Sequence, residues 1–190
     1  MARFDGVSWA QPPDRQPAAG PDAYSGGVAE VDLDRHWYGA DDAPVTLVEY
    51  GDFECPYCGA AAPVLRRLVD TSGGAVRLVF RHFPLFTTHA FALTAALAAE
   101  ASGDKFWQMH DLLFAHQHRL TDADLAGYAR QIGAGEVTGA AAQAHRPEVE
   151  ADYTSGVDAG VRGTPTLFAD GRLYSGKVEL NALHRALGLP

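Results

Sequence analysis

The chain has 190 residues, of which 47% are hydrophobic and 21% are charged. This balance is typical of a globular protein with one domain, or with one domain that carries an insertion. The formal net charge of -9 argues against nucleic acid and anionic membranes as main partners, because both require clustered Lys and Arg.

The N-terminal residues 1–27 contain several prolines and glycines and little apolar periodicity, which predicts a flexible lead-in. No stretch of seven or more apolar residues follows Met1. Neither a secretory signal nor a membrane anchor is therefore visible, and we expect a cytoplasmic protein without membrane insertion. A misannotated start codon would instead place it in the periplasm or outside the cell. Residues 28–34 alternate apolar and acidic side chains, which predicts a short edge strand.

An apolar run from Val45 to Tyr50 leads directly into two cysteines, Cys55 and Cys58. Its β-branched, aliphatic and aromatic residues predict a strand buried on both faces. Helix formers resume from Gly59 to Val69, which places the cysteines at the start of a helix. The unpaired N–H groups of a helix start carry a partial positive charge that stabilises a thiolate at Cys55. Cys58, one helical turn further on, can close a disulfide ring with Cys55.

The same Cys-x-x-Cys spacing also forms half of many zinc sites. The chain has two cysteines in total, which excludes a four-cysteine site within one chain. A site of two cysteines and two histidines would need a paired histidine motif. The nearest approach to one is His110, His116 and His118, and no two of these stand three or four residues apart. We therefore expect no metal site within the chain.

A second apolar run, residues 75–83, predicts another strand, which ends at Pro84. Strand, helix and strand in this order form a βαβ unit, whose strands pair in parallel through a right-handed crossover. This arrangement places Cys55 at the carboxyl end of a strand, where α/β folds present their chemistry.

From residue 87 to about residue 160 the pattern is helical. Beyond it, residues 161–176 predict a β-hairpin with an Asp170-Gly171 turn. A C-terminal helix follows, with Gly188 as its stop. The helices expected before the hairpin are an Ala-rich one from Thr87 or Thr88 to Ala101, one containing Phe106, Met109, Leu112 and Leu113, one starting at a capping box of Thr121 and Asp124, and a weaker one limited by Pro147.

Four motifs occur together: the strand leading into Cys55-Pro-Tyr-Cys58, Pro63 in the following helix, Phe106-Trp-Gln-Met-His110, and Gly163-Thr-Pro-Thr166. Over roughly residues 28–187 the chain thus resembles the DsbA-like thiol:disulfide oxidoreductases of the thioredoxin superfamily. It most resembles the bacterial branch found alone or fused to sodium/proton antiporters. The resemblance implies an α/β thioredoxin fold over residues 28–190, with a βαβ unit, a helical insertion at about 87–160, and a ββα unit that follows a cis proline.

The resemblance also implies the roles of individual residues. The implied catalytic residues are Cys55 as the exposed nucleophile, Cys58 as the buried resolving thiol and Glu49 as a buried proton acceptor for Cys58. The residues implied to bind substrate are Pro56, Tyr57, Thr164 and Pro165, with Pro165 cis and the Thr164 backbone pairing with an extended peptide. The alternative for Glu49 is an exposed carboxylate at a sheet edge. No cofactor is implied.

Tyr57 stands where DsbA itself has a histidine, and Cys-Pro-Tyr-Cys is the glutaredoxin sequence. The expected partners are accordingly protein disulfides and thiols, and glutathione. Tyr57 adds no charge, while Asp52 and Glu54 repel a thiolate, so we expect moderate thiolate stabilisation and exchange in the reducing direction.

Two alternatives stay open. One is a glutathione-dependent isomerase or transferase of the same fold, although that branch generally has a serine where Cys55 stands. The other is a non-catalytic thioredoxin-like binding module, in which Cys55 and Cys58 form a structural disulfide or half of a metal site shared across a dimer.

Overall fold

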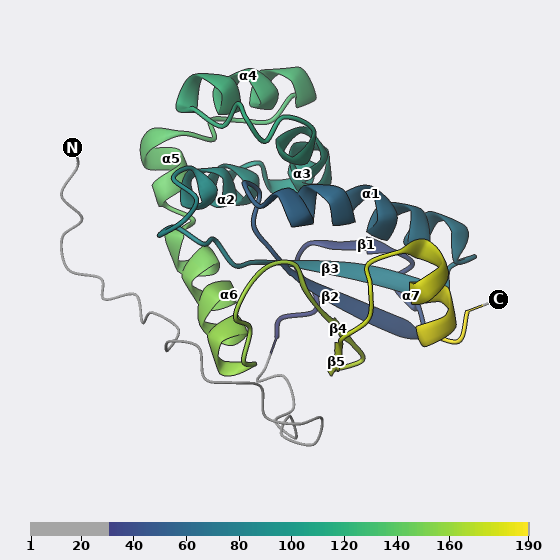
Figure 1. The fold of residues 1–190 in the computed structure, drawn as a ribbon. Coiled ribbons are helices and arrows are strands. Elements are labelled where there is room, and N and C mark those ends of the chain that lie inside the picture. Colours follow the sequence, from purple (N-terminus) through teal and green to yellow (C-terminus); the bar gives the residue numbers. More distant parts are fainter. Residues whose placement is uncertain (1–30, 190) are drawn as a thin grey trace.

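A mixed five-stranded sheet forms the centre of the computed structural model, which describes residues 31–189 (Figure 1). The predicted lead-in at 1–27 lies outside these residues. The strands follow the spatial order β1-β3-β2-β4-β5. Their bounds are β1 Trp37–Gly39, β2 Val45–Gly51, β3 Val76–His82, β4 Thr166–Ala169 and β5 Arg172–Tyr174.

The pairing of the strands matches the sequence prediction. β2 and β3 are parallel, as expected of a βαβ unit, and the other neighbours are antiparallel. β4 and β5 form the predicted hairpin, and both turn residues, Asp170 and Gly171, have positive φ angles of 47° and 77°. Two positive φ angles match a type I′ turn, whose twist suits a two-residue hairpin.

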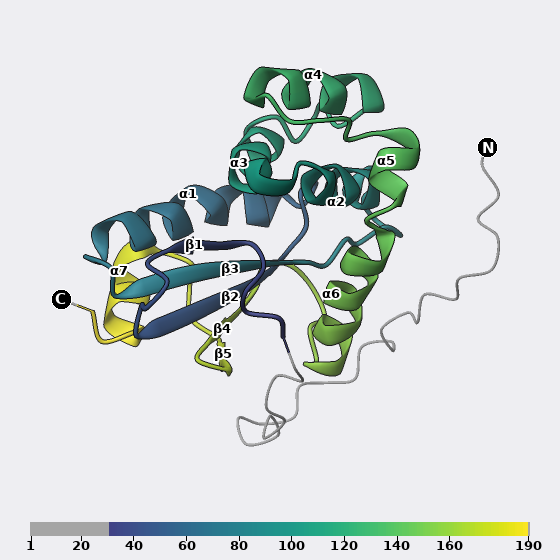
Figure 2. The ribbon, with the colours of Figure 1, turned by 180° about the vertical axis from the view of Figure 1, so that it is seen from behind.

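Helices cover both faces of the sheet and one of its ends (Figures 1 and 2). α1 and α7 lie on one face, and α6 lies on the other. The helices that belong to the insertion, α2 to α6, follow β3 and precede β4. The helix bounds are α1 Pro56–Thr71, α2 Ala92–Ala101, α3 Phe106–Ala115, α4 Asp122–Ile132, α5 Gly139–Gln143, α6 Arg146–Asp158 and α7 Leu180–Ala186, with a short 3-10 turn at Gly103–Lys105.

Alternation along the strands divides the core into two layers. On the α1 face, Leu47 of β2 packs with Leu65 of α1 and Leu183 of α7. On the opposite face, Val48 and Tyr50 pack in a second cluster with residues of α6. A third cluster fills the insertion, and its buried side chains include Phe106, Met109, Leu113 and Leu125. The element order and these layers make the α/β thioredoxin fold with a helical insertion that the sequence predicted.

Three local predictions were wrong. Residues 31–34 form no strand, and the edge strand is β1 instead, while residues 28–30 lie outside the described part. The alternation reflects packing of Val31 and Leu33 against the core without a hydrogen-bonded ladder. The Ala-rich helix begins at Ala92 rather than at Thr87 or Thr88, because the backbone at 85–89 forms a turn first.

Pro147 does not limit a helix. It lies in the first turn of α6, where a missing N–H costs no hydrogen bond, and the helix then runs for 13 residues. The capping box at Thr121 and Asp124 is confirmed at the start of α4, where the Thr121 side chain accepts from the Asp124 N–H.

Candidate active site

The two cysteines lie where β2 passes into α1. Cys55 is the N-cap residue of α1, and Pro56 occupies its first turn. Cys58 is fully buried, and its Sγ is 3.5 Å from the backbone N of Asp52. Cys55 is only 3% exposed, so the expectation of an exposed nucleophile was wrong. The carbonyl of Thr164, 3.3 Å from the Cys55 Sγ, helps to cover the sulfur.

The two thiols differ sharply in acidity. A hydrogen bond from the Cys58 thiol, with those from the backbone N–H groups of Cys58 and Tyr57, lowers the pKa of Cys55 to about 5 although burial opposes this. Burial raises the pKa of Cys58 far above its ordinary value. At neutral pH the site can therefore hold a thiolate at Cys55 and a neutral thiol at Cys58.

Two carboxylates beside the site, Asp52 and Glu54, are occupied by hydrogen bonds. The buried Asp52 carboxylate accepts from the backbone N of Leu85 at 2.8 Å and contacts Nδ1 of His89 at 2.7 Å. Glu54 accepts from the backbone N of Phe91 at 2.6 Å. These partners offset the repulsion expected of the two acids. The prediction of only moderate thiolate stabilisation was too weak, since a thiol pKa of about 5 is well below the usual 9.

A third carboxylate, that of Glu49, lies in the middle of the sheet. Strand alternation places it on the α1 face together with Leu47, and its residue is 0% exposed. Neither carboxylate oxygen has a hydrogen-bond partner within the described residues. Burial, with the charge of Cys55 added, raises the pKa of Glu49 to about 8. The alternative of an exposed edge carboxylate is therefore wrong.

The loop before β4 forms the other wall of the site. The Thr164–Pro165 peptide bond is cis, and the pairing of β4 with β2 brings this loop beside the start of α1. Tyr57 is 74% exposed and Phe91 is 41% exposed. The covered sulfur of Cys55 and the Thr164 carbonyl thus lie together at the start of α1, which also carries the exposed Tyr57.

One contact of the site was absent from the sequence interpretation. Gln117, in the turn after α3, donates from Nε2 to the backbone oxygens of Phe53 and Cys55 at 2.9 and 2.8 Å. No spacing rule finds this contact, because a side chain of the insertion meets backbone atoms more than 60 residues earlier in the chain.

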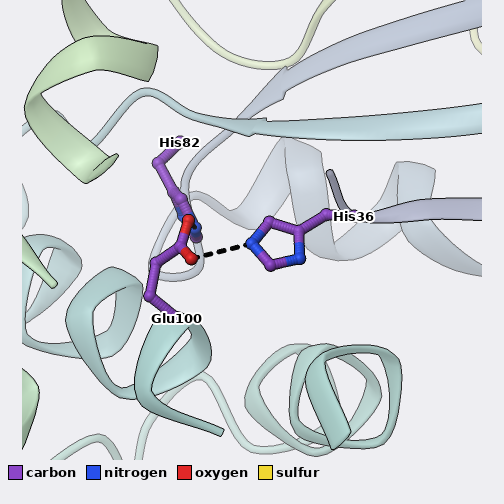
Figure 3. A group of neighbouring side chains, drawn as sticks. All are labelled: His36, His82 and Glu100. Carbon is purple, nitrogen blue, oxygen red and sulfur yellow. Dashed lines mark hydrogen bonds and ion pairs between the residues drawn. The ribbon is translucent and has the colours of Figure 1, made fainter. Parts of the chain in front are cut away.

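Figure 3 shows a different polar group, in which the imidazoles of His36 and His82 approach the Glu100 carboxylate. Their Nε2 atoms lie 2.8 and 3.1 Å from its oxygens. The donor atoms all lie within 4.8 Å of one another, and two imidazoles and a carboxylate suit a divalent transition metal. However, the guanidinium of Arg35 pairs with both Glu100 and Asp152. A metal would have to displace this cation.

We therefore describe these five residues, Arg35, His36, His82, Glu100 and Asp152, as an ion-pair network, here called the Glu100 network. Burial lowers the pKa of His36 to about 4, so at pH 7 its neutral ring donates to Glu100. The network joins the segment before β1 to the end of β3, to α2 and to α6. Sequence spacing could not reveal it, because its members come from four separate segments.

The sheet order and the buried dithiol at a helix start define a dithiol protein of thioredoxin fold. A family model described as Thioredoxin matches residues 32–188, and the chain belongs to this family. Among curated relatives, Na(+)/H(+) antiporter NhaA 1 of Salinispora arenicola is 47% identical over 166 residues, which cover 84% of this chain and 25% of that protein. NhaA 3 of Salinispora tropica is 44% identical over 179 residues, with the same coverage. The chain spans about a quarter of these relatives.

Solved structures with the same fold include DsbA-like proteins. The thiol-disulfide exchange protein alpha-DsbA2 of Wolbachia pipientis is 23% identical with a TM-score of 0.70, covering 83% of this chain and 87% of that one. BdbD of Bacillus subtilis, oxidised, is 23% identical with a TM-score of 0.65, covering 80% and 90%. A thioredoxin-like oxidoreductase of Silicibacter pomeroyi is 28% identical with a TM-score of 0.68, covering 80% and 89%. Among residues 31–189 we find no helix with the length and hydropathy needed to cross a membrane.

Proposed function

We propose that this protein is a thiol:disulfide oxidoreductase in which Cys55 and Cys58 exchange with protein or glutathione disulfides. The observation that carries the proposal is the contrast between the two sulfurs, an acidic thiol at the start of α1 and a buried neutral thiol one turn later. Exchange chemistry requires a thiolate for the first attack and a second thiol to release the product. Membership of the thioredoxin family supports the same reaction class.

The reaction has two steps. The Cys55 thiolate attacks one sulfur of the substrate disulfide, forming a mixed disulfide and releasing one substrate thiolate, which takes a proton from water. Cys58 then gives its proton to Glu49 and attacks the Cys55 sulfur. This second step forms the Cys55–Cys58 disulfide and releases the other substrate thiolate, so the substrate gains two electrons and the protein loses them.

Glu49 suits the role of proton acceptor in its ionised form, because a carboxylate with a pKa of about 8 is a stronger base than an ordinary one and becomes more available as pH rises through 8. For substrate binding we propose that the Thr164 backbone pairs with an extended peptide while Pro56, Tyr57 and Pro165 line the same face. Support comes from the exposure of Tyr57 and from the carbonyl of Thr164 beside the sulfur. No metal or organic cofactor enters the proposed reaction.

We also propose the reducing direction and a cytoplasmic location. A Cys55 pKa of about 5 falls between the thiol pKa of thioredoxin, about 7, and that of DsbA, about 3.5. We expect a reduction potential less oxidising than that of DsbA, roughly -200 mV and close to the glutaredoxin range. The glutathione pool of the cytosol has a reduction potential at or below this value. At equilibrium with that pool the protein would be largely reduced. Equilibration in glutathione buffers tests this, and a potential above about -150 mV would point to an oxidase.

The reaction itself is tested by reduction of a model protein disulfide with purified enzyme. Cys55→Ser should lower the rate to that of the uncatalysed reaction. Cys58→Ser should still attack and should accumulate as a mixed disulfide, visible by mass spectrometry. Substantial turnover by Cys55→Ser would remove Cys55 from the nucleophile role, whereas two unreactive thiols with bound metal would favour the binding-module alternative.

A further inference from the structure

The geometry points to Gln117 as a positioning residue that sets the reactivity of Cys55, an inference that rests on the proposed exchange function. Gln117 belongs to the helical insertion, in the turn after α3, and its amide nitrogen donates both to the Phe53 and to the Cys55 backbone oxygens. One side chain of the insertion thus bonds to both ends of the short segment from Phe53 to Cys55, which precedes α1.

The position of this amide depends on Gly59. A Cβ built on Gly59 would lie 2.3 Å from Oε1 of Gln117, closer than side-chain atoms approach one another. The absence of a side chain in the first turn of α1 therefore leaves the space in which the Gln117 amide lies. Gly59 has ordinary helical backbone within α1, so a glycine is needed there for the close approach of Gln117 and not for a positive φ.

The contact bears on the thiolate in two ways. First, the Phe53 and Cys55 carbonyls present negative dipole ends next to the cysteine, and the N–H groups of Gln117 offset that negative potential. Second, the Cys55 oxygen also accepts the first α-helical bond, from the Gly59 N–H at 3.0 Å. Fixing this oxygen keeps Cys55 at the N-cap of α1, where the backbone N–H groups of Tyr57 and Cys58 stabilise its thiolate.

If Gln117 only connected the insertion to the sheet domain, it would make similar contacts. The test must therefore measure the ionisation and reactivity of the Cys55 sulfur. Loss of one net hydrogen bond corresponds to a rise of roughly half a unit to one unit in the pKa of Cys55. The direct measurement is the thiolate absorbance at 240 nm as a function of pH, checked by the pH profile of iodoacetamide alkylation in Cys58→Ser backgrounds. Neither measurement requires turnover.

Gln117→Met removes the two donors at similar side-chain length, and Gln117→Glu removes them and adds a negative charge. We expect the pKa of Cys55 to rise in both, further in Gln117→Glu, and alkylation below that pKa to slow by roughly threefold to tenfold. Gln131→Met and Gln131→Glu are the matched controls, because Gln131 is an exposed residue of α4 in the same insertion. They should leave the profile unchanged.

Gly59→Ala gives an independent test of the same contact. Alanine favours a helix more than glycine does, yet its Cβ displaces the Gln117 amide, so the Cys55 pKa should rise without loss of helix. Profiles for both Gln117 variants that match the Gln131 controls would overturn the inference. If the Gln117 variants fail to fold, the Gly59→Ala profile decides. Failure of the proposed function is a different result, namely turnover that survives Cys55→Ser.

Discussion

Two buried glutamates of this protein are surrounded in opposite ways. Glu49 lies beneath the dithiol with no hydrogen-bond partner for either oxygen among residues 31–189, and its pKa is raised to about 8. Glu100 is also buried, but two imidazoles and the Arg35 guanidinium lie against its carboxylate. The comparison shows that burial alone does not fix the role of a carboxylate. The partnered carboxylate connects elements, whereas the unpartnered one has the unbonded oxygens that our proposal of a proton acceptor requires.

The largest effect should come from breaking the partnered glutamate. Glu100→Ala leaves the half-buried Arg35 and the buried Asp152 with one acid missing, and removing one member of a buried ion pair costs about 3–5 kcal/mol of unfolding free energy. Urea unfolding at pH 7 measures this. Glu150→Gln is the matched control, since it breaks only an i,i+4 pair with Arg146 and should cost about 0.5 kcal/mol or less. A loss below 1 kcal/mol for Glu100→Ala would mean that the network contributes little.

Substitution of the unpartnered glutamate, Glu49, should instead change the rate of disulfide exchange. Glu49→Gln keeps the shape but cannot accept a proton, so the attack of Cys58 on the mixed disulfide should slow by roughly 100-fold. The first attack by Cys55 should change far less. Stopped-flow kinetics with a fluorescent disulfide separates the two steps, and Glu54→Gln serves as a control at a carboxylate that is bonded to the Phe91 backbone. If the rate of the second step is unchanged, the Cys58 proton goes to an acceptor other than Glu49.

A smaller effect should appear in the pH dependence of stability. Because the folded pKa of Glu49 is raised from 4.5 to about 8, its contribution is fully present below pH 4.5 and is lost as pH rises through 8. The lowered pKa of Cys55 acts in the opposite direction, so the useful quantity is the difference between wild type and Glu49→Gln. Between pH 6 and pH 8 the reduced wild type should lose about 2 kcal/mol relative to the variant. Parallel stability curves would contradict a raised Glu49 pKa.

Much of the fold could be predicted from the sequence because its signals are local. The apolar run into Cys55, the Asp170-Gly171 turn and the Thr121 capping box each depend on neighbouring residues, and the structure has all three features. The start of α2 and the position of the edge strand were missed. There, tertiary contacts override local pattern: Leu85 accepts the turn bonds before α2, and Val31 packs without pairing.

The candidate site likewise has parts that could be predicted from the sequence and parts that could not. The cysteines, Glu49 and the Thr164–Pro165 loop could be proposed as site residues through motif resemblance, and the structure brings the cysteines and this loop together. Gln117 and the Glu100 network could not, because their partners are far apart in sequence and the Gln117 contacts are to backbone oxygens, which carry no residue identity. The charge balance at the site could not be predicted either. From the sequence, Asp52 and Glu54 are expected to repel the Cys55 thiolate, because the backbone N–H groups that bond to their carboxylates are not known.

The placement of Glu49 beneath the dithiol has a consequence for how protons accompany electrons. Between about pH 5 and pH 8, reduction of the disulfide yields a Cys55 thiolate and a Cys58 thiol, so the sulfurs take up one proton for two electrons. The reduction potential of the Cys55–Cys58 pair then falls by about 30 mV for each unit of rise in pH. Because the new thiolate charge also raises the Glu49 pKa, the carboxylate binds a further fraction of a proton near pH 8 and steepens that dependence. The reduction potential of the Cys55–Cys58 pair is thereby coupled to the pH of its surroundings.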